Sequence, residues 1–152
     1  MSNFATTRLA KELLKINNEK IDGIIIDKPD DLMLWNAKII GPIGTPYENG
    51  IFELILRFDT DYPNRPPSVQ FITPMFHPNI YRDGKICVDI LQAEWTPAQN
   101  VRTILLSIMS LLTDPNPASP ANRDAAILYT SNKKEYDIKV IEFIEMNKNN
   151  II

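Results

Sequence analysis

The segment from His77 to Trp95 contains the only histidine and the only cysteine of the 152-residue chain. A lone cysteine cannot form an intramolecular disulfide, and without partner thiols it is a poor metal ligand, so no metal site is predicted. Three roles remain for Cys87: a buried structural thiol, a redox-active thiol or a catalytic nucleophile. A nucleophilic cysteine needs solvent access, a route to its thiolate and stabilisation of the oxyanion that its attack generates.

The residues next to Cys87 supply part of this requirement. Asp83 and Gly84 are a tight-turn signal, so we expect the chain to reverse just before the cysteine. Lys85 and Asp89 place opposite charges on the two sides of Cys87, so the local charge gives no indication of how readily the thiolate forms. These residue types leave both a catalytic and a structural cysteine open.

His77 and Asn79 lie upstream and are joined by Pro78, which fixes the backbone between them. The cysteine and histidine of papain-like hydrolases come from distant parts of the chain, so we do not assign His77 as a base. We interpret it as a loop-tethering residue whose ring nitrogens bond backbone groups. The amide of Asn79 is able to donate to an oxyanion or to tie down the loop that carries Cys87.

The whole chain has the composition of an ordinary globular protein, with 44% hydrophobic and 23% charged residues. Its length predicts a single domain over residues 1–152. A formal net charge of −3 argues against direct nucleic-acid binding. We expect no membrane span and no secretory signal, and the single cysteine favours a reducing cytoplasmic or nuclear setting.

Hydrophobic periodicity predicts an α+β fold in which helices pack on one sheet. The expected strands are Ile21–Asp27, Leu32–Ile40, Ile51–Phe58 and Val69–Ile72, joined by turn-sized gaps as an antiparallel meander. The expected helices are Phe4–Asn18, Asn100–Leu112, Ala121–Thr130 and Asn132–Asn147. The stretch from Pro74 to Ala98 has no sustained period, which is typical of a functional segment.

The segment from His77 to Ala98, which we call the active segment, contains the motifs His77-Pro78-Asn79, Gly84-Lys85-Ile86-Cys87, Asp89-Ile90-Leu91 and Trp95-Thr96-Pro97-Ala98. Further motifs are Trp35-Asn36-Ala37, Gly44-Thr45-Pro46-Tyr47, Asp61-Tyr62-Pro63, Arg65-Pro66-Pro67 and Asp114-Pro115-Asn116-Pro117. In this order and at this spacing, the motifs resemble those of ubiquitin-conjugating enzymes. The resemblance runs through nearly the whole chain and shows no long insertion, so a minimal catalytic domain is expected.

The resemblance implies the ubiquitin-conjugating fold: an N-terminal helix, a four-stranded antiparallel meander, a central helix and two C-terminal helices. It implies that an activating enzyme passes ubiquitin to Cys87 as a thioester, which a substrate lysine then attacks with a RING-type ligase. General descriptions of such enzymes include ATP and nucleotide binding. ATP and Mg are expected to be used by the upstream activating enzyme, with no cofactor bound directly by this chain.

The resemblance also assigns roles to residues around the thiol. Asn79 takes the position that stabilises the oxyanion or supports the active-site loop, and its exact role stays open. At the gate opposite Cys87 the family often has an acidic residue, and this chain has Ser119, a departure that leaves Asp89 or a partner to contribute. Residues expected to dock the activating enzyme and the ligase are Arg8, Lys11, Pro63, Asn64, Thr96, Pro97 and Ala98.

The motif Asn116-Pro117-Ala118-Ser119-Pro120, with its neighbours, looks most like the conjugating enzymes of DNA-damage tolerance and DNA repair. Those enzymes modify histone and sliding-clamp lysines, so such substrates are expected for a monomer that is cytoplasmic and nuclear. Ser119-Pro120 is also an acceptor pattern for proline-directed kinases.

Three alternatives remain. One is a conjugating enzyme for another ubiquitin-like modifier, and the second is a non-catalytic scaffolding variant of the family, against which the intact context of Cys87 argues. The third, without any family resemblance, is a small thiol hydrolase. It would need a histidine distant in sequence, and the only histidine is His77.

Overall fold

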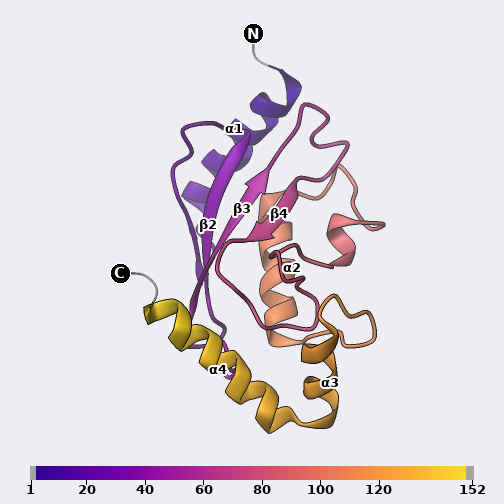
Figure 1. Ribbon diagram of the computed structural model, residues 1–152. Helices are drawn as coiled ribbons and strands as arrows, with labels where there is room; N and C mark the ends of the chain where they lie inside the picture. Colours follow the sequence, from indigo (N-terminus) through magenta and orange to yellow (C-terminus); the bar gives the residue numbers. More distant parts are fainter. Residues whose placement is uncertain (1–2, 150–152) are drawn as a thin grey trace.

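The computed structural model describes residues 3–149, and its elements follow the predicted order (Figure 1). The strands are β1 (Ile24–Ile26), β2 (Leu34–Ile40), β3 (Ile51–Arg57) and β4 (Ser68–Phe71). The helices are α1 (Phe4–Asn18), α2 (Val101–Thr113), α3 (Arg123–Ser131) and α4 (Lys133–Asn149), with a short 3-10 turn, η1 (Asp89–Leu91), before α2. The predicted α+β fold, with its N-terminal helix, meander, central helix and two C-terminal helices, is confirmed.

Two local differences from the prediction have physical causes. The strand predicted from Ile21 begins only at Ile24, because Gly23 adopts a φ of 79° that interrupts an extended strand. The segment after Cys87 was predicted to be irregular, yet it forms the single turn η1. This turn is short enough that no hydrophobic period could signal it.

The sheet is an antiparallel meander in the order β1-β2-β3-β4, and alternate residues along its strands face the core. Trp35 of β2 pairs with Leu56 of β3, and Leu54 pairs with Phe71 of β4. All four side chains are at most 2% exposed. Each buries apolar surface that stabilises the fold by roughly 1.5–3 kcal/mol.

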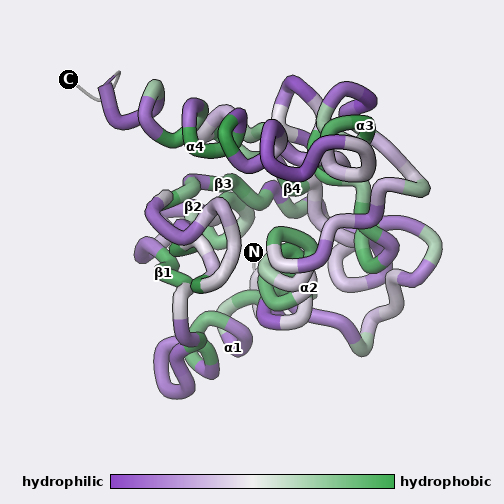
Figure 2. The backbone as a smooth tube through the Cα atoms, turned by 90° about the horizontal axis from the view of Figure 1, so that it is seen from below, coloured by the Kyte–Doolittle hydropathy of each residue, from purple (hydrophilic) through white to green (hydrophobic). Residues whose placement is uncertain are grey.

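Helix α2 shares the core with the inner face of the sheet (Figures 1 and 2). Its buried residues recur at helical spacing: Val101, Ile104, Leu105, Ile108 and Leu112. The helix begins with a capping box, in which the Asn100 side chain and the Thr103 hydroxyl each bond the other residue's backbone amide. Burial of one face leaves the opposite face of α2 free to line a site.

Helices α3 and α4 lie at the opposite end of the molecule from α1 (Figure 1). The Tyr47 hydroxyl donates to the Phe76 carbonyl at 2.6 Å and shares a hydrogen bond with the Tyr136 hydroxyl of α4 at 2.6 Å. Burial raises the pKa of both hydroxyls, so both stay protonated in this contact. Within residues 3–149 no helix is both long and apolar enough to span a bilayer.

Candidate active site

Cys87 lies at the end of a short hairpin that follows β4. Its amide donates to the Asn79 carbonyl at 2.8 Å, which fixes the backbone at the thiol. The hairpin turns at Gly84, which has a φ of 92°, and a Cβ there would lie 2.0 Å from the Phe71 carbonyl oxygen. Only glycine fits this turn, and the reversal predicted at Asp83 and Gly84 is confirmed. The cysteine side chain is half-buried.

The thiol opens onto a groove of about 540 Å³. One wall is η1, which carries Asp89, and a second is the segment around Ser119. The third wall is the free face of α2, which contributes Thr103, Leu106, Ser107 and Leu111. This mixture of hydroxyl and apolar groups along a helix suits an extended peptide segment that ends at the thiol.

Asn79 is 1% exposed and ties the hairpin to the Ser119 segment. Its side-chain oxygen accepts from the Asn116 amide at 2.8 Å, and its Nδ2 donates to the carbonyls of Asn116 at 2.8 Å and Ser119 at 3.1 Å. The two carbonyls require the NH2 group on that side, so this network also fixes the orientation of the amide. Both N–H groups are engaged, so in this conformation the amide supports the loop and has no donor left for an oxyanion.

His77 is buried beside Asn79. Its Nδ1 accepts from the Asn79 amide at 2.9 Å, so Nε2 carries the proton and donates to the Leu111 carbonyl of α2 at 2.8 Å. Burial lowers the pKa of His77 to about 4, against the weaker opposing effect of the Leu111 carbonyl. The ring is therefore neutral, and both nitrogens are occupied by backbone groups, as a tethering role requires.

The groove brings together four of the predicted site residues, namely Asn79, Cys87, Asp89 and Ser119. Asp89 and Ser119 are exposed at its rim, whereas His77 is no part of its lining. Ser119 is held in place through its backbone carbonyl, which leaves its hydroxyl accessible to solvent. Within the described part of the chain, no group of three or more His, Cys, Asp or Glu residues is arranged to hold a metal ion.

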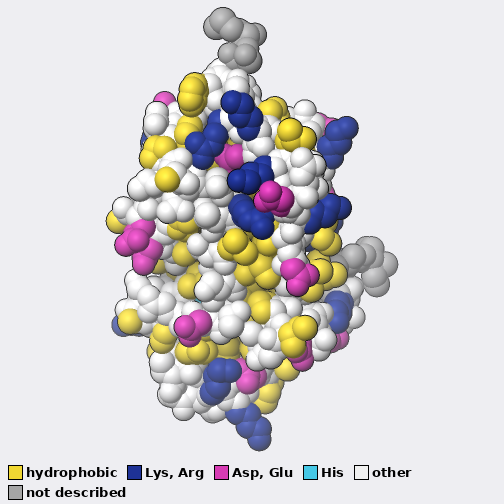
Figure 3. Space-filling view, turned by 180° about the vertical axis from the view of Figure 1, so that it is seen from behind, with side chains coloured by type: hydrophobic (Ala, Val, Ile, Leu, Met, Phe, Trp, Pro, Cys, Tyr) yellow, Lys and Arg dark blue, Asp and Glu magenta, His cyan; other side chains and the backbone are white. Residues whose placement is uncertain are grey.

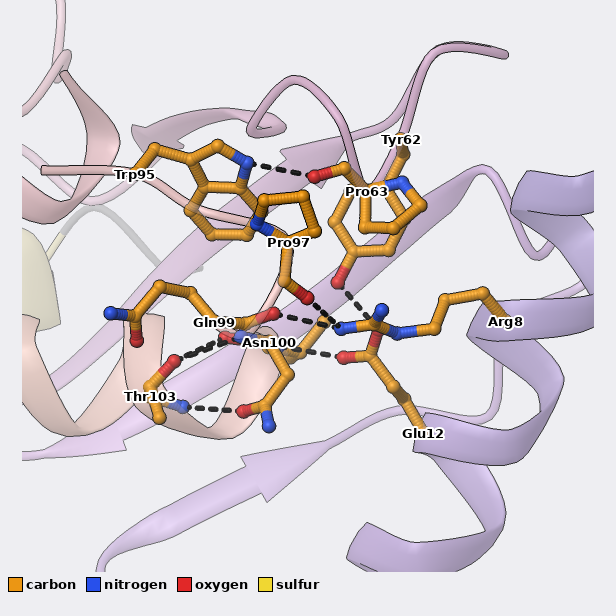
Figure 4. A network of polar contacts seen from close by, with 10 residues as sticks. Arg8, Glu12, Tyr62, Pro63, Trp95, Pro97, Gln99, Asn100 and Thr103 are labelled. Carbon is orange, nitrogen blue, oxygen red and sulfur yellow. Dashed lines mark hydrogen bonds and ion pairs between the residues drawn. The ribbon is translucent and has the colours of Figure 1, made fainter. Parts of the chain in front are cut away.

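Arg8, a predicted docking residue of α1, belongs to a network of polar contacts around Glu12 (Figure 4). The Glu12 carboxylate, 10% exposed, accepts from Arg8 Nε at 2.9 Å, from the Tyr62 hydroxyl at 2.5 Å and from the Val101 amide at 2.7 Å. Burial, followed by this hydrogen bond, raises the pKa of Tyr62. A carboxylate at the first amide of α2 is also favoured by the helix dipole.

Arg8 extends this network into the loop that precedes α2 (Figure 4). Its guanidinium donates to the carbonyls of Pro97 at 3.1 Å and Gln99 at 2.8 Å. The Trp95 indole N–H in turn donates to the Pro63 carbonyl at 2.9 Å. Helix α1 and the two loops are therefore one hydrogen-bonded unit, which we call the docking unit.

Two of the predicted docking residues are less exposed than the prediction assumed. Pro63 is buried, and its carbonyl accepts from the Trp95 indole, which comes from a segment far along the chain. Arg8 is only partly exposed because its guanidinium bonds the Pro97 and Gln99 carbonyls. The remaining five are exposed: Lys11, Asn64, Thr96, Pro97 and Ala98. Figure 3 shows Lys and Arg side chains gathered toward the α1 end of the face it displays.

Glu12, Tyr62 and Trp95 hold the docking unit together. None of the three was assigned this role from the sequence, although Tyr62 and Trp95 belong to motifs that carry the family resemblance. One signal was present: Glu12 follows Arg8 by four residues, which is the spacing of an ion pair on a helix. That spacing predicts the contact within α1. The bonds to Tyr62 and Val101 depend on tertiary packing, which no local pattern encodes.

The comparison with protein families agrees with this geometry. Residues 8–144 match the family model described as "Ubiquitin-conjugating enzyme". The chain therefore belongs to the ubiquitin-conjugating enzyme family, whose members transfer ubiquitin through a cysteine thioester. Family membership brings ubiquitin, an activating enzyme and a ligase as partners. The expectation of ATP and nucleotide binding does not carry over, because these enzymes do not themselves bind the nucleotide.

Similar proteins carry the name "Ubiquitin-conjugating enzyme E2 2". One from Candida glabrata is 51% identical over 95% of this chain and 87% of its own length. One from Saccharomyces cerevisiae is 50% identical over 95% of this chain and 85% of its own length. One from Neurospora crassa is 48% identical over 95% of this chain and 97% of its own length.

We expect His77 to make the protein less stable as the pH falls from about 6.5 towards about 4. The histidine of the unfolded chain takes up a proton near pH 6.5, whereas the folded protein takes it up only near pH 4. In this window the unfolded state binds more protons, which costs the folded state roughly 2 kcal/mol at about pH 5. Urea unfolding of the native protein and of His77→Gln at several pH values measures the effect. Because carboxylates titrate in both proteins, only the difference in slope counts, and parallel slopes would contradict the expectation.

We expect Lys11→Ala and Arg8→Ala to weaken charging by the activating enzyme in different ways. Lys11 is exposed, so its loss raises KM several-fold and leaves the urea midpoint unchanged. Loss of Arg8 also lowers the free energy of unfolding by about 1 kcal/mol, because two loop carbonyls and Glu12 lose their donor. Lys28→Ala, which removes an exposed lysine after β1, is the matched control. A Lys11→Ala protein that charges like this control would exclude Lys11 from docking.

Proposed function

We propose that Cys87 carries the ubiquitin thioester of this enzyme. The observation that supports this is the coincidence of the chain's only cysteine with the mouth of the groove. The Cys87 thiolate attacks the thioester carbonyl carbon presented by the activating enzyme, and the activating enzyme's cysteine leaves as a thiolate. A substrate lysine then attacks the new thioester, an isopeptide bond forms and Cys87 is released.

The groove is where the C-terminal segment of ubiquitin would lie. That segment must reach Cys87 in an extended conformation to place its last carbonyl at Sγ. Thr103 and Ser107 on α2 present hydroxyls along this path, and Leu106, 43% exposed, presents an apolar contact. Asn79 serves the reaction by holding the Ser119 segment, which forms the opposite wall. The chain binds no cofactor in this scheme, since ATP and Mg serve the activating enzyme.

The motifs around Ser119 and Cys87 also support an assignment to one subfamily. They favour a conjugating enzyme of DNA-damage tolerance, acting in the cytoplasm and nucleus with a RING-type ligase on histone or sliding-clamp lysines. The similarity to the fungal relatives over almost the whole chain supports a shared biochemical activity. Transfer of a different ubiquitin-like modifier is the competing assignment, and the first experiment below separates the two.

We expect the native protein to form a ubiquitin adduct that thiol reductants remove. The protein is incubated with ubiquitin, its activating enzyme, Mg and ATP, and the products are separated without reductant. Cys87→Ala gives no adduct, whereas Cys87→Ser gives an oxyester that survives reductant, because the serine oxygen replaces the only thiol. If the native protein gives no adduct with ubiquitin but one with another modifier and its activating enzyme, the modifier assignment is wrong. If Cys87→Ala still charges, the site assignment is wrong.

We expect a negative charge at Ser119 to change the rate at which the thioester discharges to lysine. A phosphate of about −2 charge on this exposed hydroxyl would stand at the rim of the groove, where the attacking amine arrives. The single-turnover discharge of charged Ser119→Asp to free lysine should differ at least about threefold from that of Ser119→Ala, which has neither the hydroxyl nor the charge. Equal rates for the two variants would remove Ser119 as a regulatory position.

A further inference from the structure

Lys85 and Cys87 project from the same side of one extended segment. Ile80 and Ile86 pair as an antiparallel bridge, and a backbone hydrogen bond flanks the pair on each side. Ile86 is 7% exposed and points into the core. Because side chains alternate along an extended chain, its two neighbours, Lys85 and Cys87, point the other way. Lys85 is exposed and Cys87 is half-buried, in agreement with this alternation.

The spacing brings the amine of Lys85 within reach of an acyl group on Cys87. Residues two apart in a strand have Cα atoms about 6.6 Å apart, which an extended lysine side chain is able to span. The backbone stays extended just beyond the thiol, since Val88 has φ −142° and ψ 138°. Among residues 3–149 no carboxylate lies within 4.0 Å of the Lys85 amine, so no ion pair there restrains it.

The Lys85 side chain lies outside the groove. The groove lining runs from Cys87 to η1, α2 and the Ser119 segment, and Lys85 is no part of it. A ubiquitin tail that occupies the groove therefore does not have to displace the Lys85 side chain. The amine is attached to the same backbone as the thioester, so its effective concentration is on the order of millimolar, comparable to that of an added free lysine.

We propose that Lys85 is a self-modification site, which takes the ubiquitin acyl group directly from Cys87. The inference rests on the proposed thioester at Cys87. The neutral amine of Lys85 attacks the thioester carbonyl carbon, the bond from that carbon to Sγ breaks, and Cys87 leaves as a thiolate. The proton lost from the amine passes to solvent or to that thiolate, and an isopeptide bond remains on Lys85. The attached ubiquitin then covers the thiol and prevents reloading, so slow self-transfer limits the lifetime of a charged enzyme that meets no substrate.

The test uses ubiquitin whose lysines are all methylated, so that ubiquitin cannot be the acceptor. The full-length protein is charged, Mg is removed to stop the activating enzyme, and the adduct is followed at several dilutions with and without reductant. Native protein should convert the reductant-sensitive adduct into a resistant one at a first-order rate that dilution does not change, with the modification mapped to Lys85 by peptide mass spectrometry. Lys85→Arg keeps the charge but has no nucleophilic amine, so it should form at least about tenfold less resistant adduct.

Lys28→Arg is the matched control, because Lys28 is an exposed lysine beyond β1, at the opposite edge of the sheet from the β4 residue with which Lys85 pairs. It should behave as the native protein. A charged native protein that forms no resistant adduct overturns the self-modification, as does an adduct that Lys85→Arg retains or whose rate falls on dilution. A native protein that forms no reductant-sensitive adduct overturns the thioester assignment as well, so the two failures are distinguishable.

Discussion

The position of α2 is the constraint on which both functional regions depend, and it is set by a buried polar contact at each end of the helix. An α-helix leaves its first amides and last carbonyls without partners in the helix. The Glu12 carboxylate of the docking unit accepts from the first amide, that of Val101. His77 of the active segment donates to the Leu111 carbonyl in the last turn. The helix that lines the groove is thus anchored by one residue from each region it connects.

The Cys87 thiol is held in a fixed position although it lies in a segment with little regular structure. Such a segment has few backbone hydrogen bonds of its own, and buried polar groups must replace them. The Asn79 side chain makes three such bonds and the Asn79 carbonyl fixes the Cys87 amide. Within the described residues no buried side-chain N or O atom lacks a partner. A satisfied network of this kind is stiff, and a fixed thiol suits a reaction that depends on positioning.

The sequence was sufficient for the features that depend on local periodicity. The spacing of apolar residues predicts the buried face of α2 and the alternation along β3. The dipeptide Asp83-Gly84 predicts the turn at Gly84. Cys87 could be singled out because it is the only cysteine. The tethering role of His77 was predicted because it lies too close to Cys87 in the chain for a papain-like arrangement. The contacts that could not be predicted join segments far apart in sequence. Pro63 is buried and Glu12 reaches Val101 only because segments far apart in sequence meet in the fold.

The separation of the two regions also explains why their polar contacts differ in kind. The docking unit is joined largely by charged groups, Arg8 and Glu12, which keep a basic helix face and two loops in one arrangement while Lys11 remains free for a partner. The active segment is joined by neutral groups, because a charged group buried next to the thiol would shift its reactivity and would be costly to bury. Histidine meets this need only while neutral, and burial keeps it so at physiological pH. Neutral polar residues thus place Cys87 without adding a fixed charge, which leaves the electrostatics of the groove to Asp89, Glu94 and the arriving amine.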